Sequence, residues 1–266
     1  MNGLGRADSA TLLLWRIAAW AGPVFILGIL VFWGLVAGYL PAPPQDWSPA
    51  EITAKYTEHN VAIKVGMVGV LVCVPLYFVW SSVVSRIMQR VEGPSGVLAN
   101  VELAAGIVTA ITGMLFSACW LAAAFHIADR TPQDIMLMHD LGWMFFNVTF
   151  AVPLMQMLAF GALPFVDRRG VPLFPRWLGW LSFAASGTFV CILLMPFVKN
   201  GPFSWNGLLT YWLVLGAYFL WMGLAMYFVF PAIRRIEAEE AVPADAAGTA
   251  NRHVPAGSAS AVRSDG

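Results

Sequence analysis

The stretch that decides the fold covers residues 139–165 and reads HDLGWMFFNVTFAVPLMQMLAFGALPF. It is long and apolar enough to cross a bilayer, because a spanning helix needs about 20 mainly apolar residues. It nevertheless begins with His139 and Asp140 and contains Asn147, Thr149 and Gln156. Lipid offers such groups no hydrogen-bond partners, so we expect them to face protein or water.

The rest of the chain has the same apolar character. Of its 266 residues, 59% are hydrophobic and 11% are charged, whereas a soluble protein carries about 25% charged residues. The mean hydropathy of +0.71 is more than one soluble core of this size can hide. The net charge is zero and the basic residues do not cluster, which argues against a nucleic-acid partner. The lipid bilayer is the expected partner.

The apolar segments predict an all-α fold, a bundle of six transmembrane helices. The predicted spans cover residues 12–40, 61–84, 97–124, 139–165, 177–198 and 208–230. Between the first two, Ser48, Pro49 and Glu51 combine a cap, a first-turn proline and a capping box. They predict a short amphipathic surface helix that places Ile52 and Tyr56 on one face.

The segments outside the spans set the domain organisation and the orientation. We expect an N-terminal segment over residues 1–11, a transmembrane domain over 12–235 and a disordered tail over 236–266, because the tail lacks apolar periodicity. A polar loop is expected between the third and fourth spans. Most basic residues outside the tail fall at the two ends of the chain and in the even-numbered loops, which places both termini in the cytoplasm.

Histidines supply one candidate site. His59, His126 and His139 are predicted at the same, non-cytoplasmic, membrane surface, and acidic residues stand beside them in the sequence. Imidazoles with carboxylates can bind a metal ion, and histidines on facing helices can ligate haem. No spacing puts two of them on one helical face, so ordinary interface histidines are the favoured alternative. The sequence requires no cofactor, and Cys73 and Cys119, like Cys191, are expected to be small buried hydrophobes.

The fourth span supplies the second candidate site. Asp140, Asn147, Thr149 and Gln156 could form a polar path or a ligand-binding pocket from the outer surface to mid-membrane. The alternative is hydrogen bonding between helices, worth about 0.6 kcal/mol per contact. Proline in the middle of this span could also free a backbone carbonyl.

Glu102 is a further candidate for ligand binding, because a carboxyl group inside a span is a functional candidate by default. It lies about one turn inside the third span on the cytoplasmic side. The favoured alternative is that its side chain reaches the interface near Arg86 or Arg90.

Four segments carry a resemblance to known proteins: SPAEITAKYTEHN (48–60), HDLGWMFF (139–146), FPRWLGWL (174–181) and NGPFSWNG (200–207). Over residues 12–235 the chain resembles an uncharacterised family of bacterial six-span integral membrane proteins of unknown function. The resemblance implies a bacterial inner (cytoplasmic) membrane protein. It brings no substrate, cofactor or catalytic residue.

Three classes of function follow. The first is a protein that binds or transports a small molecule through an outward-facing pocket beside the fourth span. The second is an accessory or scaffold subunit, with a membrane-protein partner or a second copy of itself. The third, a metal- or haem-dependent membrane enzyme using the outer histidines, is the least favoured, because no HxxxH or HExxH spacing puts two ligands on one helical face. The chain also has no phosphate-binding glycine loop and no nucleophile elbow.

Overall fold

The computed structural model describes residues 8–241, and none of these residues forms a strand. Six helical segments are long and apolar enough to cross a membrane: Ser9–Val36, Asn60–Glu92, Val97–Phe125, Pro132–Val166, Arg176–Phe197 and Leu208–Ala241. This confirms the predicted all-α, six-span fold. The predicted N-terminal segment and tail lie mostly outside the described residues.

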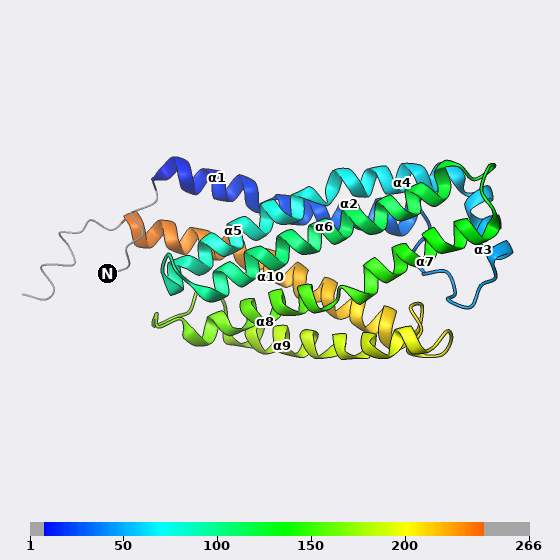
Figure 1. The fold of residues 1–266 in the computed structure, drawn as a ribbon. Helices are drawn as coiled ribbons and strands as arrows, with labels where there is room; N and C mark the ends of the chain where they lie inside the picture. Colours follow the sequence, from blue (N-terminus) through cyan, green and yellow to red (C-terminus); the bar gives the residue numbers. More distant parts are fainter. Residues whose placement is uncertain (1–7, 242–266) are drawn as a thin grey trace, which may run out of the picture.

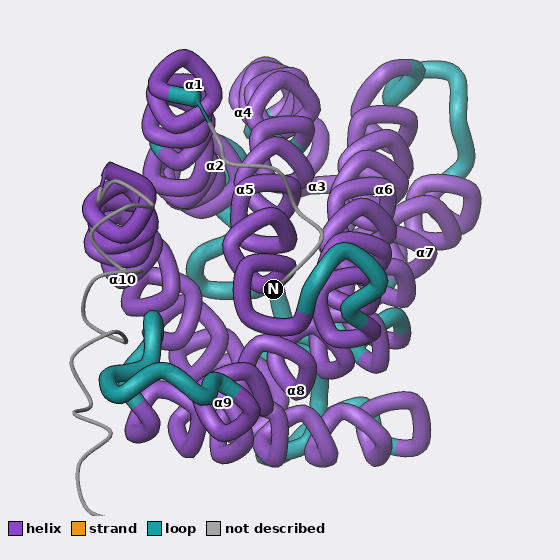
Figure 2. The backbone as a smooth tube through the Cα atoms, turned by 90° about the vertical axis from the view of Figure 1, so that its left-hand side faces the viewer, coloured by secondary structure: helices purple, strands orange, loops and turns teal. Residues whose placement is uncertain are grey.

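The six spans form a closed ring in which each span packs against its neighbours along the chain, and the last packs against the first (Figures 1 and 2). Span one contains α1 (Ser9–Ala19), α2 (Ala21–Gly28) and η1 (Ile29–Val36), and span two contains α4 (Asn60–Cys73) and α5 (Pro75–Glu92). Span three is α6 (Val97–Phe125), and span four contains α7 (Pro132–Val148) and α8 (Ala151–Val166). Span five contains α9 (Arg176–Thr188) and η2 (Phe189–Phe197), and span six contains η3 (Leu208–Leu213) and α10 (Val214–Ala241).

Prolines explain where most spans are broken. Pro23 lies in the first turn of α2, Pro75 begins α5, and Pro153 lies in the first turn of α8. A proline lacks the backbone N–H that would continue the preceding helix, but it fits the first turn of a new one. The break between α1 and α2 accordingly falls at Trp20, three residues before Pro23. In contrast, α6 runs uninterrupted and packs against both halves of spans two and four.

The short helix before span two is α3 (Pro49–Glu58), and it has the predicted capping box. The Glu51 backbone N–H donates to Ser48 Oγ (3.3 Å), and the Ser48 N–H donates to Glu51 Oε2 (2.7 Å). Ile52 and Tyr56 are buried, as their shared face predicts. The helix lies at the end of the bundle opposite the described termini (Figure 1).

Span four begins earlier than predicted. Thr131 caps α7 and forms a second capping box with Asp134, whose N–H donates to Thr131 Oγ1 at 3.3 Å. Pro132 occupies the first helical position. These residues look like a polar loop by composition, yet their order is that of a helix start. The helix therefore includes residues that we had assigned to the loop.

The last helix is longer than predicted, because acidic residues near its end pair with arginines of neighbouring segments. Glu237 pairs with Arg16 of α1, and Arg90 of α5 lies 2.8 Å from Glu240. Glu239 lies 3.4 Å from Arg169, in the α8–α9 connection. Three contacts from three parts of the ring hold α10 in helical form to Ala241, past the predicted domain end at residue 235.

These ion pairs give a graded prediction. The Arg90 and Glu240 side chains are 16% and 13% exposed, whereas Arg16 and Glu237 are 43% and 40% exposed. We expect Glu240→Gln to lower the free energy of unfolding in detergent by about 1.5 kcal/mol. Glu237→Gln should lower it by less than about 0.5 kcal/mol, because exposed pairs contribute little. Thermal unfolding of both variants tests this, and equal losses would contradict it.

Candidate functional site

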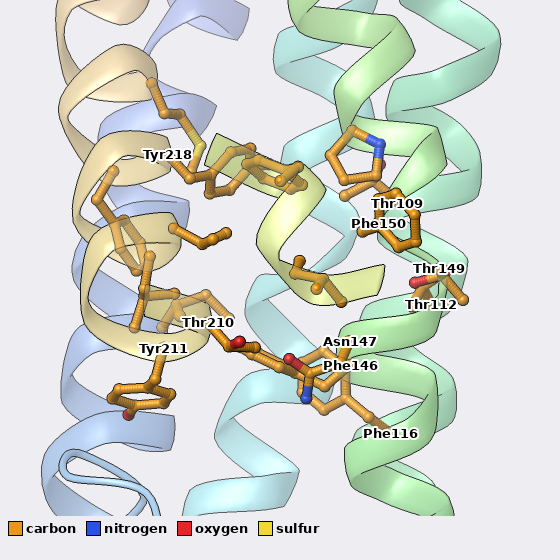
Figure 3. Close-up of a pocket in the computed structure, with 18 of the residues that line it drawn as sticks. Thr109, Thr112, Phe116, Phe146, Asn147, Thr149, Phe150, Thr210, Tyr211 and Tyr218 are labelled. Atoms are coloured by element: carbon orange, nitrogen blue, oxygen red, sulfur yellow. The ribbon is translucent and has the colours of Figure 1, made fainter. Parts of the chain in front are cut away.

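A cavity of about 140 Å³ lies inside the ring, and every span except the second contributes to its wall. In Figure 3, Thr210 and Tyr218 of span six lie on one side of it, while Asn147 and Thr149 of span four lie on the other. The wall is mostly aromatic and aliphatic. The apolar part of the lining is Phe25, Ile29, Trp33, Phe116, Phe146, Phe150, Pro153, Phe189, Ile192, Val214, Leu215, Phe219 and Met222.

The break in span four places two predicted residues in this wall. Because α7 ends at Val148 and α8 begins at Ala151, Asn147 and Thr149 sit at a bend beside the cavity. The carbonyl of Thr149, which Pro153 cannot satisfy, accepts instead from the Val152 N–H at 3.0 Å. The backbone carbonyl that the mid-span proline was expected to free is therefore paired.

Most polar side chains of the wall already donate within the protein. The hydroxyls of Thr112, Thr149 and Thr210 donate to backbone carbonyls at 3.0, 2.8 and 3.0 Å. The Asn147 Nδ2 donates to the carbonyl of Trp143, one turn earlier, at 3.0 Å. Thr109 differs: its Oγ1 is buried and has no hydrogen-bond partner among the described residues. Thr109 is thus a cavity-lining residue whose hydroxyl has no partner among the described residues, in a wall that is otherwise mostly apolar.

An aromatic cluster closes the cavity on the side of α3. We call it the His139 cluster, and it consists of Tyr39, Tyr56, Trp120, His139, Trp143 and Trp205. Tyr39 stacks on Trp120, and Trp143 stacks on Trp205, with ring centroids 4.3 and 5.5 Å apart. Trp33 and Tyr211 belong to the cavity wall and also contact Tyr39.

Hydrogen bonds fix the protonation of His139, which is fully buried. The Trp143 indole N–H, which can only donate, points to His139 Nε2 at 3.1 Å. Nε2 must therefore accept, and the neutral ring carries its proton on Nδ1. Nδ1 lies 3.1 Å from the Tyr56 hydroxyl, which lies 2.7 Å from that of Tyr39. Burial raises the pKa of both phenols, so they remain hydrogen-bond donors.

A small residue makes room for this arrangement. Trp120 donates from its indole N–H to the His139 carbonyl at 3.1 Å. A Cβ atom on Gly142 would lie 2.2 Å from the same indole nitrogen. The glycine in HDLGW therefore allows helices α6 and α7 to approach closely. In the structure, the HDLGW segment provides the space in which the Trp120 indole packs against α7.

The structure does not gather the three histidines into one site. His139 is buried with both ring nitrogens engaged, whereas His59 and His126 have exposed side chains beside Glu58 and Asp129. Among residues 8–241, no group of three or more His, Cys, Asp or Glu side chains could hold a metal ion. With Nε2 accepting from Trp143, His139 has no free lone pair for a metal or haem iron.

A second polar cluster lies on the other side of the cavity. We call it the Glu102 network, and it consists of Tyr77, Ser81, Glu102, Gln156 and Tyr218. Gln156 Nε2 donates to Glu102 Oε1 (2.9 Å) and to Ser81 Oγ (3.0 Å). The Tyr77 hydroxyl donates to Gln156 Oε1 (2.7 Å) and lies 2.8 Å from the Tyr218 hydroxyl. Tyr218 also lines the cavity.

The favoured expectation for Glu102 was wrong. Its side chain does not reach the interface near Arg86 or Arg90, because the residue is only 1% exposed and its carboxyl group turns toward Gln156. Gly106, one turn along α6, permits this, since a Cβ atom there would lie 2.1 Å from Ser81 Oγ. Helices α5 and α6 are too close together there for the Glu102 carboxyl group to reach the membrane interface.

The candidate residues therefore separate into three places. Asn147 and Thr149 line the cavity, and Glu102 and Gln156 meet in the Glu102 network. Asp140 does neither: it lies near the end of the bundle, half-buried, and its Oδ1 is buried without a hydrogen-bond partner among the described residues. The predicted continuous path along span four is thus two separate clusters.

Sequence reasoning missed Thr109, Tyr77 and Tyr218. Threonine and tyrosine are common in membrane helices, and their periodicity does not separate a cavity wall from a packed interface. The small residues opposite them were the available signal. Gly106 lies one turn from Glu102 and nearly one turn from Thr109, which marks that face of α6 as a site of close packing.

The chain is a multi-pass membrane protein whose helices enclose a small cavity between two buried polar clusters. Comparison with protein-family models, with characterised proteins and with solved structures finds no match for it.

Proposed function

We propose that this protein binds a small, neutral, mostly apolar molecule in the cavity beside the fourth span, and carries it within the membrane. The observation behind this proposal is the unpartnered Thr109 hydroxyl in an apolar wall. A buried hydroxyl without a partner costs about 1–3 kcal/mol. A ligand that supplies one acceptor would remove that cost.

The size of the cavity limits the ligand. An apolar cavity of about 150 Å³ in another protein binds benzene, and this one measures about 140 Å³. The aromatic wall favours a ligand of about one ring, and the single free donor favours one carbonyl or ether oxygen. No charged side chain lines the cavity, so an ionised ligand would be unpaired and disfavoured.

Two ring-sized probes test this proposal. Acetophenone carries a carbonyl acceptor, and α-methylstyrene has nearly the same shape with CH₂ in place of the oxygen. We expect saturable binding of acetophenone to the full-length protein in nanodiscs, and weaker binding of α-methylstyrene. Ligand-observed NMR measures both, with empty nanodiscs as the control for partitioning into lipid.

Thr109→Val should weaken acetophenone binding about 5- to 10-fold, the value of one net hydrogen bond of about 1 kcal/mol or slightly more. It should leave α-methylstyrene binding unchanged. Thr112→Val is the matched control, because that hydroxyl already donates to its own helix. Non-saturable acetophenone signals, or equal effects of the two substitutions, would overturn the proposal.

We also infer that the protein resides in the bacterial inner membrane with both termini in the cytoplasm. Arg16, Arg90 and Arg169 support this orientation, since they lie at the end of the bundle that holds both described termini (Figure 1). Basic residues favour the cytoplasmic side. Accessibility of cysteines introduced at Asp8 and Glu58 to a membrane-impermeant thiol reagent tests it: only the second should react in intact cells.

A further inference from the structure

One oxygen of the Glu102 carboxyl group is hydrogen-bonded to Gln156 and the other is not. The Ser81 hydroxyl, which accepts from Gln156, also lies beside the carboxyl group. Oε1 accepts from Gln156 Nε2 at 2.9 Å, while Oε2 is buried without a hydrogen-bond partner among the described residues. The residue is only 1% exposed. A carboxylate in such a place would leave half of its charge unsolvated.

No charge offsets that of an ionised Glu102 within residues 8–241. Helix α8 carries no titratable side chain, and the arginines of α5 point elsewhere: Arg86 donates to Gln89, and Arg90 pairs with Glu240. The other helices that pack against α6 or against Tyr77 carry their charged groups closer to the two ends of the bundle than to Glu102. The titratable and charged side chains of these helices are Glu51, Lys55, Tyr56 and Glu58 on α3; Lys64 and Cys73 on α4; Tyr77, Arg86, Arg90 and Glu92 on α5; Cys119 on α6; Asp134, His139 and Asp140 on α7; and Tyr218, Tyr227, Arg234, Arg235, Glu237, Glu239 and Glu240 on α10.

An isolated buried carboxylate is costly, and such groups become neutral instead. A hydrogen on Oε2 makes the Glu102 carboxyl neutral and leaves Oε1 as the acceptor for Gln156. This is the form that suits the observed contacts.

A directed chain of hydrogen bonds joins this carboxyl group to the cavity wall. Tyr77 gives its only hydroxyl hydrogen to Gln156 Oε1, so Tyr218 must be the donor in the Tyr218–Tyr77 bond. Gln156 then donates to Glu102. The chain starts at Tyr218, a cavity-lining residue, and ends on Glu102.

We propose that Glu102 is a proton-binding site coupled to the cavity, so that the ligand and a proton bind together. This inference rests on the proposed function, because the cavity must take a ligand. The ligand oxygen that accepts from Thr109 has a second lone pair. When that lone pair accepts from Tyr218, it withdraws the Tyr218 hydroxyl from Tyr77. Each bond in a chain strengthens the next, so the Gln156 N–H then stabilises a negative charge on Glu102 less well. Ligand binding therefore favours the protonated form: a proton from bulk water forms the O–H bond at Oε2.

Coupling is reciprocal, so a bound proton must tighten ligand binding by the same factor. We expect acetophenone to bind at least about 5-fold more tightly at the acidic end of its titration than at the alkaline end. The dependence should vanish in Glu102→Gln and in Tyr218→Phe. Glu58→Gln, at an exposed glutamate, is the control and should keep it.

Infrared difference spectroscopy provides an independent readout on the full-length protein. Wild type should show the carbonyl-stretching band of a neutral carboxylic acid that shifts in D₂O and is absent from Glu102→Gln. Acetophenone should shift the frequency of this band in wild type but not in Tyr218→Phe. Because Tyr218→Phe retains Glu102, it provides the test even if Glu102→Gln fails to fold.

The outcomes separate the two proposals. If acetophenone does not bind to wild type at any pH, the proposed function fails and the coupling fails with it, while the infrared band still decides whether Glu102 holds a proton. If acetophenone binds with the same affinity across the pH range, the proposed function stands and the coupling is overturned. Absence of the carboxylic-acid band overturns the proton site itself.

Discussion

Replacing His139 with leucine should lower the free energy of unfolding by about 2–4 kcal/mol. The substitution removes the acceptor of the Trp143 indole N–H and a partner of the Tyr56 hydroxyl, both inside the His139 cluster. A buried donor left without its partner costs about 1–3 kcal/mol. Leucine also loses the stacked contact of the imidazole with Tyr39 and its edge-to-face contact with Trp205.

His126→Leu is the matched control for this prediction, because the His126 side chain is 54% exposed. It should change stability by no more than about 0.5 kcal/mol. Thermal unfolding of both variants in the same detergent gives the comparison. If the two substitutions cost the same, His139 does not organise the cluster. If His139→Leu and His126→Leu each abolished binding of a stoichiometric metal that purified wild type contains, His139 would be a metal ligand and not a packing residue.

Filling the cavity should abolish ligand binding without unfolding the protein. Ile192 is 5% exposed and lines the cavity, while its neighbour Leu193 is 52% exposed on the outside of η2. Ile192→Phe places additional carbon atoms in a space of about 140 Å³. We expect acetophenone binding to weaken by more than about tenfold, equivalent to about 1.4 kcal/mol.

Leu193→Phe is the control, since the same substitution on the lipid side leaves the cavity intact. Its acetophenone affinity should equal that of wild type. The stability of Ile192→Phe should be unchanged or higher by up to about 1 kcal/mol, because filling a cavity is commonly stabilising. A variant that binds normally, or one that loses affinity only because it unfolds, would show that the probe occupies another place.

Apolar run length predicted the class of fold well. Lipid leaves the backbone so few choices that six long apolar segments mean six helices. The helix start at Ser48 follows from local hydrogen-bonding chemistry, and the order Thr131, Pro132, Asp134 carries the same signal. The end of α10 could not be predicted in this way, because Glu237, Glu239 and Glu240 look like a polar tail until arginines from three other segments are placed beside them.

The candidate residues were harder to interpret, because polar groups in a span have the same appearance whether they bind a ligand or each other. Asn147 and Gln156 lie on one predicted span, but the break between α7 and α8 sends one to the cavity and the other to Glu102. The partner that decides each role comes from another helix. For Glu102 that partner is Gln156, 54 residues away in the sequence.

The closed order of the ring has a consequence for synthesis. Spans two to five can each pack on the span before them as they enter the bilayer, since chain neighbours are also neighbours in space. The wall of the cavity, however, needs Tyr211, Val214 and Tyr218 from the last span. In a nascent chain that stops after span five, the cavity would lack one wall, and its aromatic lining would be exposed to lipid. The cavity is thus completed late in translation, when α10 packs against α1.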